Sequence, residues 1–299
     1  PAEVVERLTK DVKVSPVIAN LLWQRGISTY EEAKLFFRPQ LEHLHDPFLM
    51  KDMDKAVVRI EDAIKNKEKI LVYGDYDVDG TTSVALVYSF FLSHIPHLTS
   101  HISYYIPDRY KEGYGISTAG IDFAAENGCT LIIALDCGIK AIDKVDYANK
   151  KNVDFIICDH HLPGEKIPNA VAVLDPKRKD CTYPYKELSG CGIGFKLVQA
   201  FAQKHNIPIE NLEQYLDLTA ISVAADIVPI TGENRILAFY GLKRINHAPR
   251  AGIRAMMELT KMKKQLSITD IVFVIGPRIN AAGRMESGKK AVEMLISDT

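Results

Sequence analysis

The distribution of apolar residues changes along the 299-residue chain. Between residues 69 and 174, short runs rich in Ile, Leu and Val alternate with amphipathic stretches, a pattern typical of parallel strands covered by helices on both faces. The expected strands are 69–74, 101–106, 130–135, 154–158 and 170–174. The helices expected between the first four strands are 81–94, 117–127 and 140–150. We therefore predict an α/β fold with a mostly parallel five-stranded sheet flanked by helices.

Helical patterns predominate on both sides of this predicted sheet. Before it, Ser28 and Glu31 have the spacing of a capping box ahead of a helix that Pro39 ends, and an amphipathic helix follows at 54–66. After residue 187 the expected helices are 190–205, 211–225, 233–246, 250–262 and 268–276, with one more in KKAVEMLISDT. The expected parts are an N-terminal helical segment (1–50), an α/β core (51–187) and a helical part of the same domain (188–299), and we expect the natural chain to continue.

Composition and charge narrow the class of protein. No run of eighteen apolar residues is present, so no membrane span is expected. The first residues lack the apolar centre of a signal peptide, and five cysteines without a CxxC pair fit reduced thiols in a cytoplasmic protein. With a net charge of −1, a polyanionic partner would be held by a local basic patch or by metal ions.

Three carboxylates follow the first expected strand in the sequence DYDVDG, residues 75–80. Like charges this close repel one another and raise one another's pKa unless a cation lies among them. An EF-hand calcium loop is one interpretation, but its twelfth position is Leu86 instead of Glu, and a strand instead of a helix precedes it. A solvated Asp-rich turn is another interpretation. The place of the motif, between a buried strand and a helix, favours a cation site.

Other acids and imidazoles follow two further strands. Asp136 comes directly after 130–135, and Asp159, His160 and His161 come directly after 154–158. Because the carboxyl ends of parallel strands meet at one edge of a sheet, we expect these groups to lie together with the DYDVDG acids. For Asp136 alone, a helix N-cap is an equally good interpretation.

This mixture of carboxylates with imidazole suits Mn²⁺ or Mg²⁺. So many charges exceed the need of one ion, whereas two ions sharing a carboxylate would use them. The predicted ligands are Asp75, Asp77, Asp79, Asp136 and His160, with Asp136 as the bridge between the ions.

The two adjacent histidines are expected to differ in role. Neighbouring side chains on an extended backbone point in opposite directions, so we assign His160 to metal and His161 either to the substrate or to a position behind the metal ligands. Asp159 could accept a hydrogen bond from an imidazole and fix its tautomer. Asp226, which follows the apolar helix 211–225, could cap that helix or close the metal site, and spacing does not decide between these.

Basic and glycine-rich segments offer contacts to phosphate. Gly192 lies in a Gly-rich turn that opens a helix, where free N–H groups could bind phosphate, although helix packing explains such glycines equally well. Arg278 and Arg284 flank Asn280 in GPRINAAGR, and arginine recognises a terminal phosphate with two hydrogen bonds. Arg109 lies in the loop PDRYKEGYG, whose tyrosines could stack on bases.

Together these stretches resemble the DHH phosphoesterase family, named for the Asp-His-His found here at 159–161. VYGDYDVDGTTS, ALDCG, CDHH and AADIVP are similar to its four motifs in the form of RecJ-type exonucleases, and LSGCGIGFKL and IGPRINAAGRM fit the same type. The resemblance covers roughly residues 50 to 299. Relatives that act on pyrophosphate or short oligonucleotides have a histidine where this chain has Tyr73, and Asp75 would replace that ligand.

The resemblance implies a metal-dependent 5′-to-3′ exonuclease that hydrolyses phosphodiester bonds of single-stranded DNA in DNA repair and recombination. It implies that Asp226 is a metal ligand and that Arg278 holds the 5′ phosphate. Single-stranded DNA with a 5′ end, a single-strand-binding protein and a helicase are the expected partners. A DHH-associated domain and an oligonucleotide-binding fold are expected to follow in the natural chain.

Two alternatives remain open. The same site could act on small substrates such as oligonucleotides, cyclic dinucleotides or pyrophosphate. A catalytically inactive DNA-binding scaffold with the same fold is the other alternative.

Overall fold

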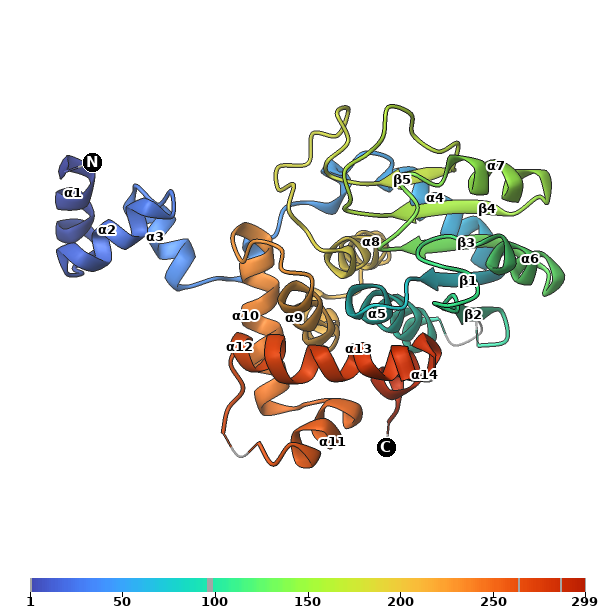
Figure 1. Ribbon diagram of the computed structural model, residues 1–299. Helices are drawn as coiled ribbons and strands as arrows, with labels where there is room; N and C mark the ends of the chain where they lie inside the picture. The colour runs from blue at the N-terminus through green and yellow to red at the C-terminus, as the bar shows by residue number, and fades with distance from the viewer. Residues whose placement is uncertain (1, 96–98, 263, 286, 299) are drawn as a thin grey trace. The chain divides into compact units, whose positions relative to one another are not determined.

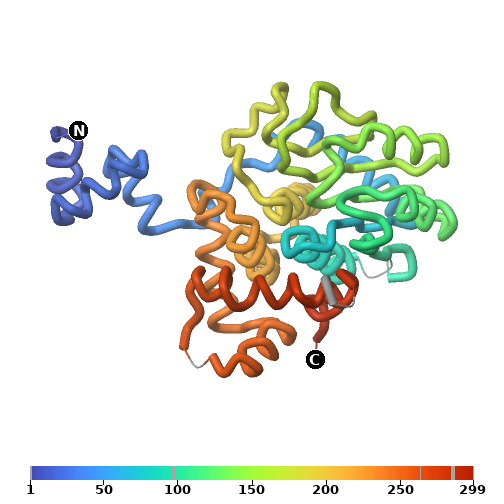
Figure 2. The backbone as a smooth tube through the Cα atoms, viewed as in Figure 1, coloured from blue at the N-terminus to red at the C-terminus, as the bar shows by residue number. Residues whose placement is uncertain are grey.

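The computed structural model describes residues 2–95, 99–262, 264–285 and 287–298, with only the backbone described at 284 and 285. Contacts divide the chain into two units, residues 1–44 and 45–299. Figure 2 traces the backbone of both from the blue N-terminus to the red C-terminus. These two units do not test the boundaries at residues 50 and 187 expected from the sequence, so that three-part division stays a prediction.

The first unit consists of three α-helices, α1 (Ala2–Val12), α2 (Pro16–Gln24) and α3 (Tyr30–Phe37), and one 3₁₀ turn, Leu41–His43. A capping box does precede α3, but it lies one residue later than predicted, between Thr29 and Glu32 instead of Ser28 and Glu31. The Glu32 carboxylate accepts the backbone N–H groups of both Ser28 (2.7 Å) and Thr29 (3.0 Å). These two hydrogen bonds favour the later register, which explains the shift.

The second unit is built on a sheet of five strands, all parallel, as the apolar runs predicted. The strands are β1 (Lys69–Gly74), β2 (Ile102–Tyr105), β3 (Cys129–Leu135), β4 (Asp154–Cys158) and β5 (Ala172–Leu174). They are hydrogen-bonded in the order β2-β1-β3-β4-β5 (Figure 1). The chain leaves β1 toward one side for β2 and returns to the other side for β3. The carboxyl ends of β1 and β3 therefore form a topological switch point, where open parallel sheets bind their ligands.

Helices cover both faces of this sheet. The helices α6 (Thr118–Glu126) and α7 (Ile142–Lys150) pack on one face, where their apolar residues join those of β1, β3 and β4 in one core. The helices α4 (Met53–Lys65), α5 (Val78–His94) and α8 (Gly190–Lys204) contact strands from the opposite face. The near-continuous burial of β3 and β4 follows from this double cover.

The helices after residue 215 extend the α5 and α8 side of the unit (Figure 1). They are α9 (Leu216–Ala225), α10 (Gly232–His247), α11 (Ala251–Leu259), α12 (Ile268–Asp270), α13 (Gly276–Met285) and α14 (Gly288–Ile296). A 3₁₀ segment, Ile209–Tyr215, precedes α9, and a π-helical turn, Ile271–Ile275, joins α12 to α13. Pro277 lacks an N–H, and the wider turn before it accommodates that loss. None of the helices in the described part of the chain is long and apolar enough to cross a bilayer.

A buried ion pair connects α8 and α10 to the start of the second unit. Lys196 is fully buried and donates to Glu233 Oε1 (3.0 Å) and to the carbonyl of His45 (2.6 Å). Glu233 also accepts hydrogen bonds from Tyr183 Oη (2.7 Å) and from the His45 N–H (3.0 Å). Every charge in this network has a partner, which is the condition under which buried charges are tolerated.

Replacing Lys196 with methionine should therefore destabilise the second unit strongly. Loss of one member leaves the Glu233 charge buried and without its cation, at a cost of about 3–5 kcal/mol in the free energy of unfolding. Lys204→Met on the same helix removes the half-exposed pair with Glu61 and should cost less than about 1 kcal/mol. Urea denaturation followed by circular dichroism measures both. Equal losses for the two variants would contradict the role given to the buried pair.

Candidate metal centre

The first acidic motif forms the tight connection between β1 and α5. Asp77 is the N-cap of α5, and its Oδ1 accepts the N–H of Gly80 at 2.9 Å. A side chain at position 80 is excluded, because its Cβ would lie 2.5 Å from the carbonyl oxygen of Asp75. The DxDxDG spacing thus bends the chain so that Asp79 enters the first turn of α5 with its carboxylate buried.

The Asp79 carboxylate is bound by the N-terminus of α8. It accepts the N–H groups of Gly190 (2.7 Å) and Cys191 (2.8 Å) and the hydroxyl of Ser222 (2.7 Å). Backbone donors and the positive end of a helix dipole stabilise a buried carboxylate. The N–H of Gly192 donates to Ser189 Oγ (3.1 Å). The phosphate cradle predicted around Gly192 is therefore filled by the protein's own carboxylate and hydroxyl.

Three carboxylates from distant parts of the chain converge on the imidazole of His160. Its Nε2 lies 3.2 Å from Asp136 Oδ1, 3.5 Å from Asp226 Oδ2 and 3.8 Å from Asp79 Oδ2. Among the described residues, neither ring nitrogen of His160 nor Oδ1 of Asp136 has a hydrogen-bond partner, although all three atoms are buried. Buried polar atoms are nearly always satisfied. A divalent cation held between Nε2 and the carboxylates would satisfy the atoms that face it, and the oxygen-rich donor set fits Mn²⁺ or Mg²⁺.

The protonation of these acids reflects the same crowding. Burial, followed by the charges of Asp79 and Asp77, raises the pKa of Asp136 far above its usual range. Burial and the same two charges raise the pKa of Asp226 to about 7. Burial is also the main reason why the pKa of Asp75 rises to about 7. A bound cation would reverse these shifts by stabilising the ionised forms.

Asp75 and Asp77 occupy the side of the site that faces the loop after β2. Asp75 accepts the N–H of Tyr76 (2.7 Å) and, through its other oxygen, that of Gly115 (2.6 Å). Asp77 Oδ2 lies 3.4 Å from the hydroxyl of Tyr114. The structure thus groups Asp79, Asp136 and Asp226 around His160, whereas Asp75 and Asp77 lie nearer to the tyrosine loop.

Asp159 holds His161 in a fixed orientation. Its Oδ1 accepts Nδ1–H of His161 at 2.7 Å, and its Oδ2 accepts the N–H of Ile139 at 2.8 Å. Burial alone would raise the pKa of Asp159, but the hydrogen bond and charge of His161 bring it below its usual value. The same hydrogen bond raises the pKa of His161. The opposite nitrogen, Nε2, is therefore left for a ligand, and one nitrogen of His161 lies within 4.8 Å of ligand atoms of Asp136 and His160.

The loop that carries Arg109 and the helix α13 that carries Arg278 both meet Tyr76. The guanidinium of Arg109 lies over the Tyr76 ring, 5.2 Å from its centre. In α13, Gly283 allows close approach, because a Cβ there would lie 2.9 Å from the Tyr76 carbonyl oxygen. Arg278 is exposed on this helix and donates to the Val274 carbonyl (2.8 Å).

Two further predicted residues belong to α13. Asn280 is half-buried, and the side chain of Arg284 lies outside the described residues. The sequence GPRINAAGR is thus helical, apart from its last side chain, which is not described.

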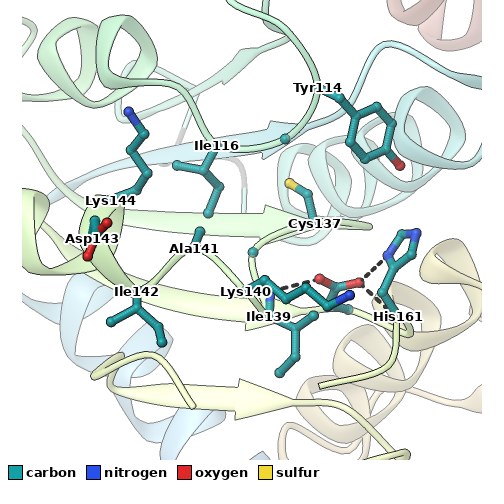
Figure 3. A pocket seen from close by; sticks show the side chains of 13 residues that line it. Tyr114, Ile116, Cys137, Ile139, Lys140, Ala141, Ile142, Asp143, Lys144 and His161 are labelled. Carbon is teal, nitrogen blue, oxygen red and sulfur yellow. Dashed lines mark hydrogen bonds and ion pairs between the residues drawn. The ribbon is translucent and has the colours of Figure 1, made fainter. Parts of the chain in front are cut away.

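The structure adds residues that the sequence did not single out. Ser222 binds Asp79, and it lies one helical turn before Asp226, a spacing that could have identified it. A cavity of about 500 Å³ adjoins the site and is lined by Tyr114, the loop 137–144, Asp159 and His161, among others (Figure 3). Tyr114, Asp159 and His161 belong to motifs that the sequence singled out, whereas the wall formed by residues 139–144 carries no recognisable sequence signal.

Comparison with known proteins agrees with this geometry. The model of the DHH family, N-terminal domain, matches residues 69–223, which include the first three acidic motifs and the residues up to Val223. The chain belongs to the DHH family. Its name-giving motif is Asp159-His160-His161, the segment that supplies the central imidazole and its hydrogen-bonded neighbour.

Individual DHH relatives extend the similarity beyond that domain. The chain is 39% identical over 295 residues to the single-stranded-DNA-specific exonuclease RecJ of Bacillus subtilis, covering 98% of this chain and 36% of the relative. It is 34% identical over 307 residues to RecJ of Escherichia coli, covering 99% of this chain and 52% of the relative. The chain thus spans about a third to a half of the length of these curated relatives.

Solved structures of DHH proteins superpose closely. A structure of exonuclease RecJ bound to manganese matches with a TM-score of 0.74 and 30% identity, over 87% of this chain and 63% of that one. RecJ of Thermus thermophilus in complex with Mn²⁺ matches with a TM-score of 0.81 and 27% identity, over 100% of this chain and 42% of that one.

The close packing of Gly190 against Asp136 allows the role of Asp136 in the candidate metal centre to be tested. A Cβ at position 190 would lie 2.6 Å from the Asp136 Cβ and 2.7 Å from its Oδ1, whereas one at position 194 would meet its neighbours at an ordinary 3.4 Å. Gly190→Ala should displace Asp136 and weaken Mn²⁺ binding about 10- to 100-fold, the usual effect of disturbing the support of a metal ligand. Gly194→Ala should leave Mn²⁺ affinity unchanged. Isothermal titration calorimetry decides, and unchanged affinity in Gly190→Ala would exclude Asp136 from the metal site.

Proposed function

We propose that this chain is the catalytic part of a metal-dependent exonuclease that hydrolyses phosphodiester bonds of single-stranded DNA in the 5′-to-3′ direction. The observation that carries the proposal is the convergence of Asp79, Asp136 and Asp226 on the buried Nε2 of His160, which has no hydrogen-bond partner among the described residues. The similarity to single-stranded-DNA-specific exonucleases, whose structures include Mn²⁺ and Mg²⁺ complexes, supports both the metal and the substrate.

The proposed centre holds two divalent ions. Asp79, His160 and Asp226 offer ligand atoms within 4.8 Å of one another and would hold one ion, and Asp75 and Asp77 would hold the other. Asp136 would serve both, because its Oδ1 faces His160 and its carboxyl group is close enough to Asp77 to hydrogen-bond with it. Such ions, when bound, lower the pKa of water and offset charge on phosphoryl oxygens.

The protein's own contribution to the reaction would come from His161. Asp159 accepts the Nδ1–H proton and raises the pKa of the ring, which favours the doubly protonated imidazolium, whose Nε2–H can donate. A donor held in place before the reaction stabilises charge that develops on a phosphoryl oxygen. Asp159 is almost fully buried and is hydrogen-bonded to His161, so its proposed role is to orient that ring.

Recognition of the 5′ end is assigned to Arg109 and to the basic residues of α13. Arg109 lies on the Tyr76 ring, and α13 packs against its backbone, which brings Arg278, Asn280 and Arg284 onto a helix that borders the same loop. Arginine suits a terminal phosphate because it donates two parallel hydrogen bonds. Gly192 is not included, since its N–H already has an acceptor.

The proposed setting is DNA repair and recombination in the cytoplasm, with a single-strand-binding protein and a helicase as partners. The similarity to RecJ proteins supports the DNA substrate. The five cysteines are all buried and free, which suits a reducing compartment. The division into an N-terminal helical segment, a catalytic core and a helical extension is part of the same proposal.

Tyr73 argues against a small-molecule phosphohydrolase. Its ring is fully buried, and its hydroxyl donates to the Gly115 carbonyl (2.8 Å) and accepts the N–H of Ser117 (3.1 Å). The position that carries a histidine in pyrophosphatase-type relatives is thus part of the core in this chain.

Asp136→Asn should abolish hydrolysis while preserving the fold. Removing the shared carboxylate should lower turnover of a 5′-phosphorylated single strand with Mn²⁺ by more than about 100-fold, since disturbing only the support of a ligand costs 10- to 100-fold. The control is Asp146→Asn on the exposed side of α7, a variant that should cleave the strand normally.

Comparing cleavage of the long strand with cleavage of a dinucleotide tests the substrate class, and cleavage of the dinucleotide alone would contradict the proposed exonuclease.

A further inference from the structure

We propose that the cavity beside the DHH motif is a nucleotide subsite, which holds the base of a nucleotide adjoining the scissile phosphate. The inference rests on the proposed function and deepens it. In this arrangement the base lies between Tyr114 and the apolar wall of the cavity, and the phosphate end faces His161 and Lys140.

The size and lining of the cavity suit a flat, largely apolar group. Its volume of about 500 Å³ falls within the range of pockets that bind small ligands, about 300–1,000 Å³. The walls are formed by Ile116 from the loop before α6 and by Ala141 and Ile142 at the start of α7, and Tyr114 stands at the rim (Figure 3). Apolar walls with a few polar groups at one end are typical of sites for a base or similar ring.

The cavity is continuous with the proposed reaction site through the DHH motif. Asp159 and His161 both belong to its lining, and His161 also lies within ligand distance of Asp136 and His160. Figure 3 shows His161 and Tyr114 at the same end of the cavity, with Ile142 and Lys144 at the other. A strand whose phosphate contacts His161 would therefore place a neighbouring base at the opening of this cavity.

The ring of Tyr114 is held in place and is accessible for a base to stack on it. Its ring is perpendicular to those of Tyr76 and His161, with centres 5.7 Å and 6.4 Å apart, and its hydroxyl is directed at Asp77 (3.4 Å). These contacts hold the ring, yet 53% of the residue is exposed to solvent. Aromatic rings held in this way are the usual platforms for bases of single-stranded nucleic acids.

The charges around the cavity favour a phosphate at the His161 end. Lys140 is exposed, and Figure 3 shows its side chain running toward the His161 end. Lys144 donates to the Thr118 hydroxyl (2.6 Å) at the far end. The negative charge of Asp159 is offset by His161, to which it is hydrogen-bonded. A nucleotide would thus bind with its base between Tyr114 and the apolar wall and its phosphate near Lys140 and the proposed metal ligands.

Binding of deoxyadenosine 5′-monophosphate and deoxyribose 5-phosphate to the Mn²⁺-loaded chain, measured by isothermal titration calorimetry, tests the subsite without requiring hydrolysis. The wild-type chain should prefer the nucleotide by about 5- to 150-fold, which is the usual contribution of one stacked base converted to an affinity ratio. Tyr114→Ala should abolish the preference, and Ala141→Phe should do so by filling the cavity. Tyr110→Ala, which removes an exposed tyrosine of the same loop, should keep it. Lys140→Gln should weaken both ligands alike.

Equal affinity of the wild-type chain for the two ligands, or an unchanged preference in Tyr114→Ala, would overturn the subsite. Mn²⁺ titration of Tyr114→Ala shows whether the metal centre is intact and thus separates stacking from structural damage. Failure of the proposed exonuclease would appear differently, as lack of strand cleavage by a wild-type chain that binds Mn²⁺, whatever its preference for the base.

Discussion

Repulsion among buried carboxylates is the constraint on which this structure depends. Asp79, Asp136 and Asp159 are almost completely inaccessible to solvent, and Asp226 reaches the same point from α9. The fold offsets part of this charge itself, because the start of α8 and Ser222 bind Asp79, and His161 binds Asp159. Within the described part of the chain, Asp136 and His160 keep buried polar atoms without hydrogen bonds. The remaining charge is what a divalent cation would neutralise, so the architecture and the proposed chemistry have the same cause.

Close approach between backbone segments is the second feature on which the site depends. Glycines at 80, 190 and 283 lie where a Cβ would collide with Asp75, with the Asp136 carboxylate and with the Tyr76 carbonyl, respectively. The turn after β1, the start of α8 and helix α13 can therefore close around one small volume at the switch point of the sheet. These contacts bring the backbone segments that carry the proposed metal ligands close to those that carry the proposed phosphate contacts.

The sheet could be predicted from sequence because its strands are continuous apolar runs. The acids at 75–79, 136 and 159 could be found because each group follows a strand end, whereas Asp226 follows a helix and is assigned only through the family resemblance. Details that depend on tertiary contacts could not be predicted. The capping box lies one residue later than predicted because Glu31 and Glu32 are adjacent and either could close it. The N–H groups of the turn around Gly192 bind Ser189 and Asp79, and Asp79 lies more than a hundred residues earlier in the chain. The cavity beside His161 arises only when Tyr114 meets the start of α7, which no local pattern encodes.

The most direct test of the central claim is anomalous X-ray diffraction from crystals of the chain soaked with Mn²⁺. The account predicts two manganese peaks at the carboxyl ends of β1 and β3, with one coordinated by His160 Nε2, Asp79 and Asp226 and with the Asp136 carboxylate shared by both. Absence of any peak at this edge of the sheet at saturating Mn²⁺, with His160 still surrounded by the three carboxylates, would contradict the account.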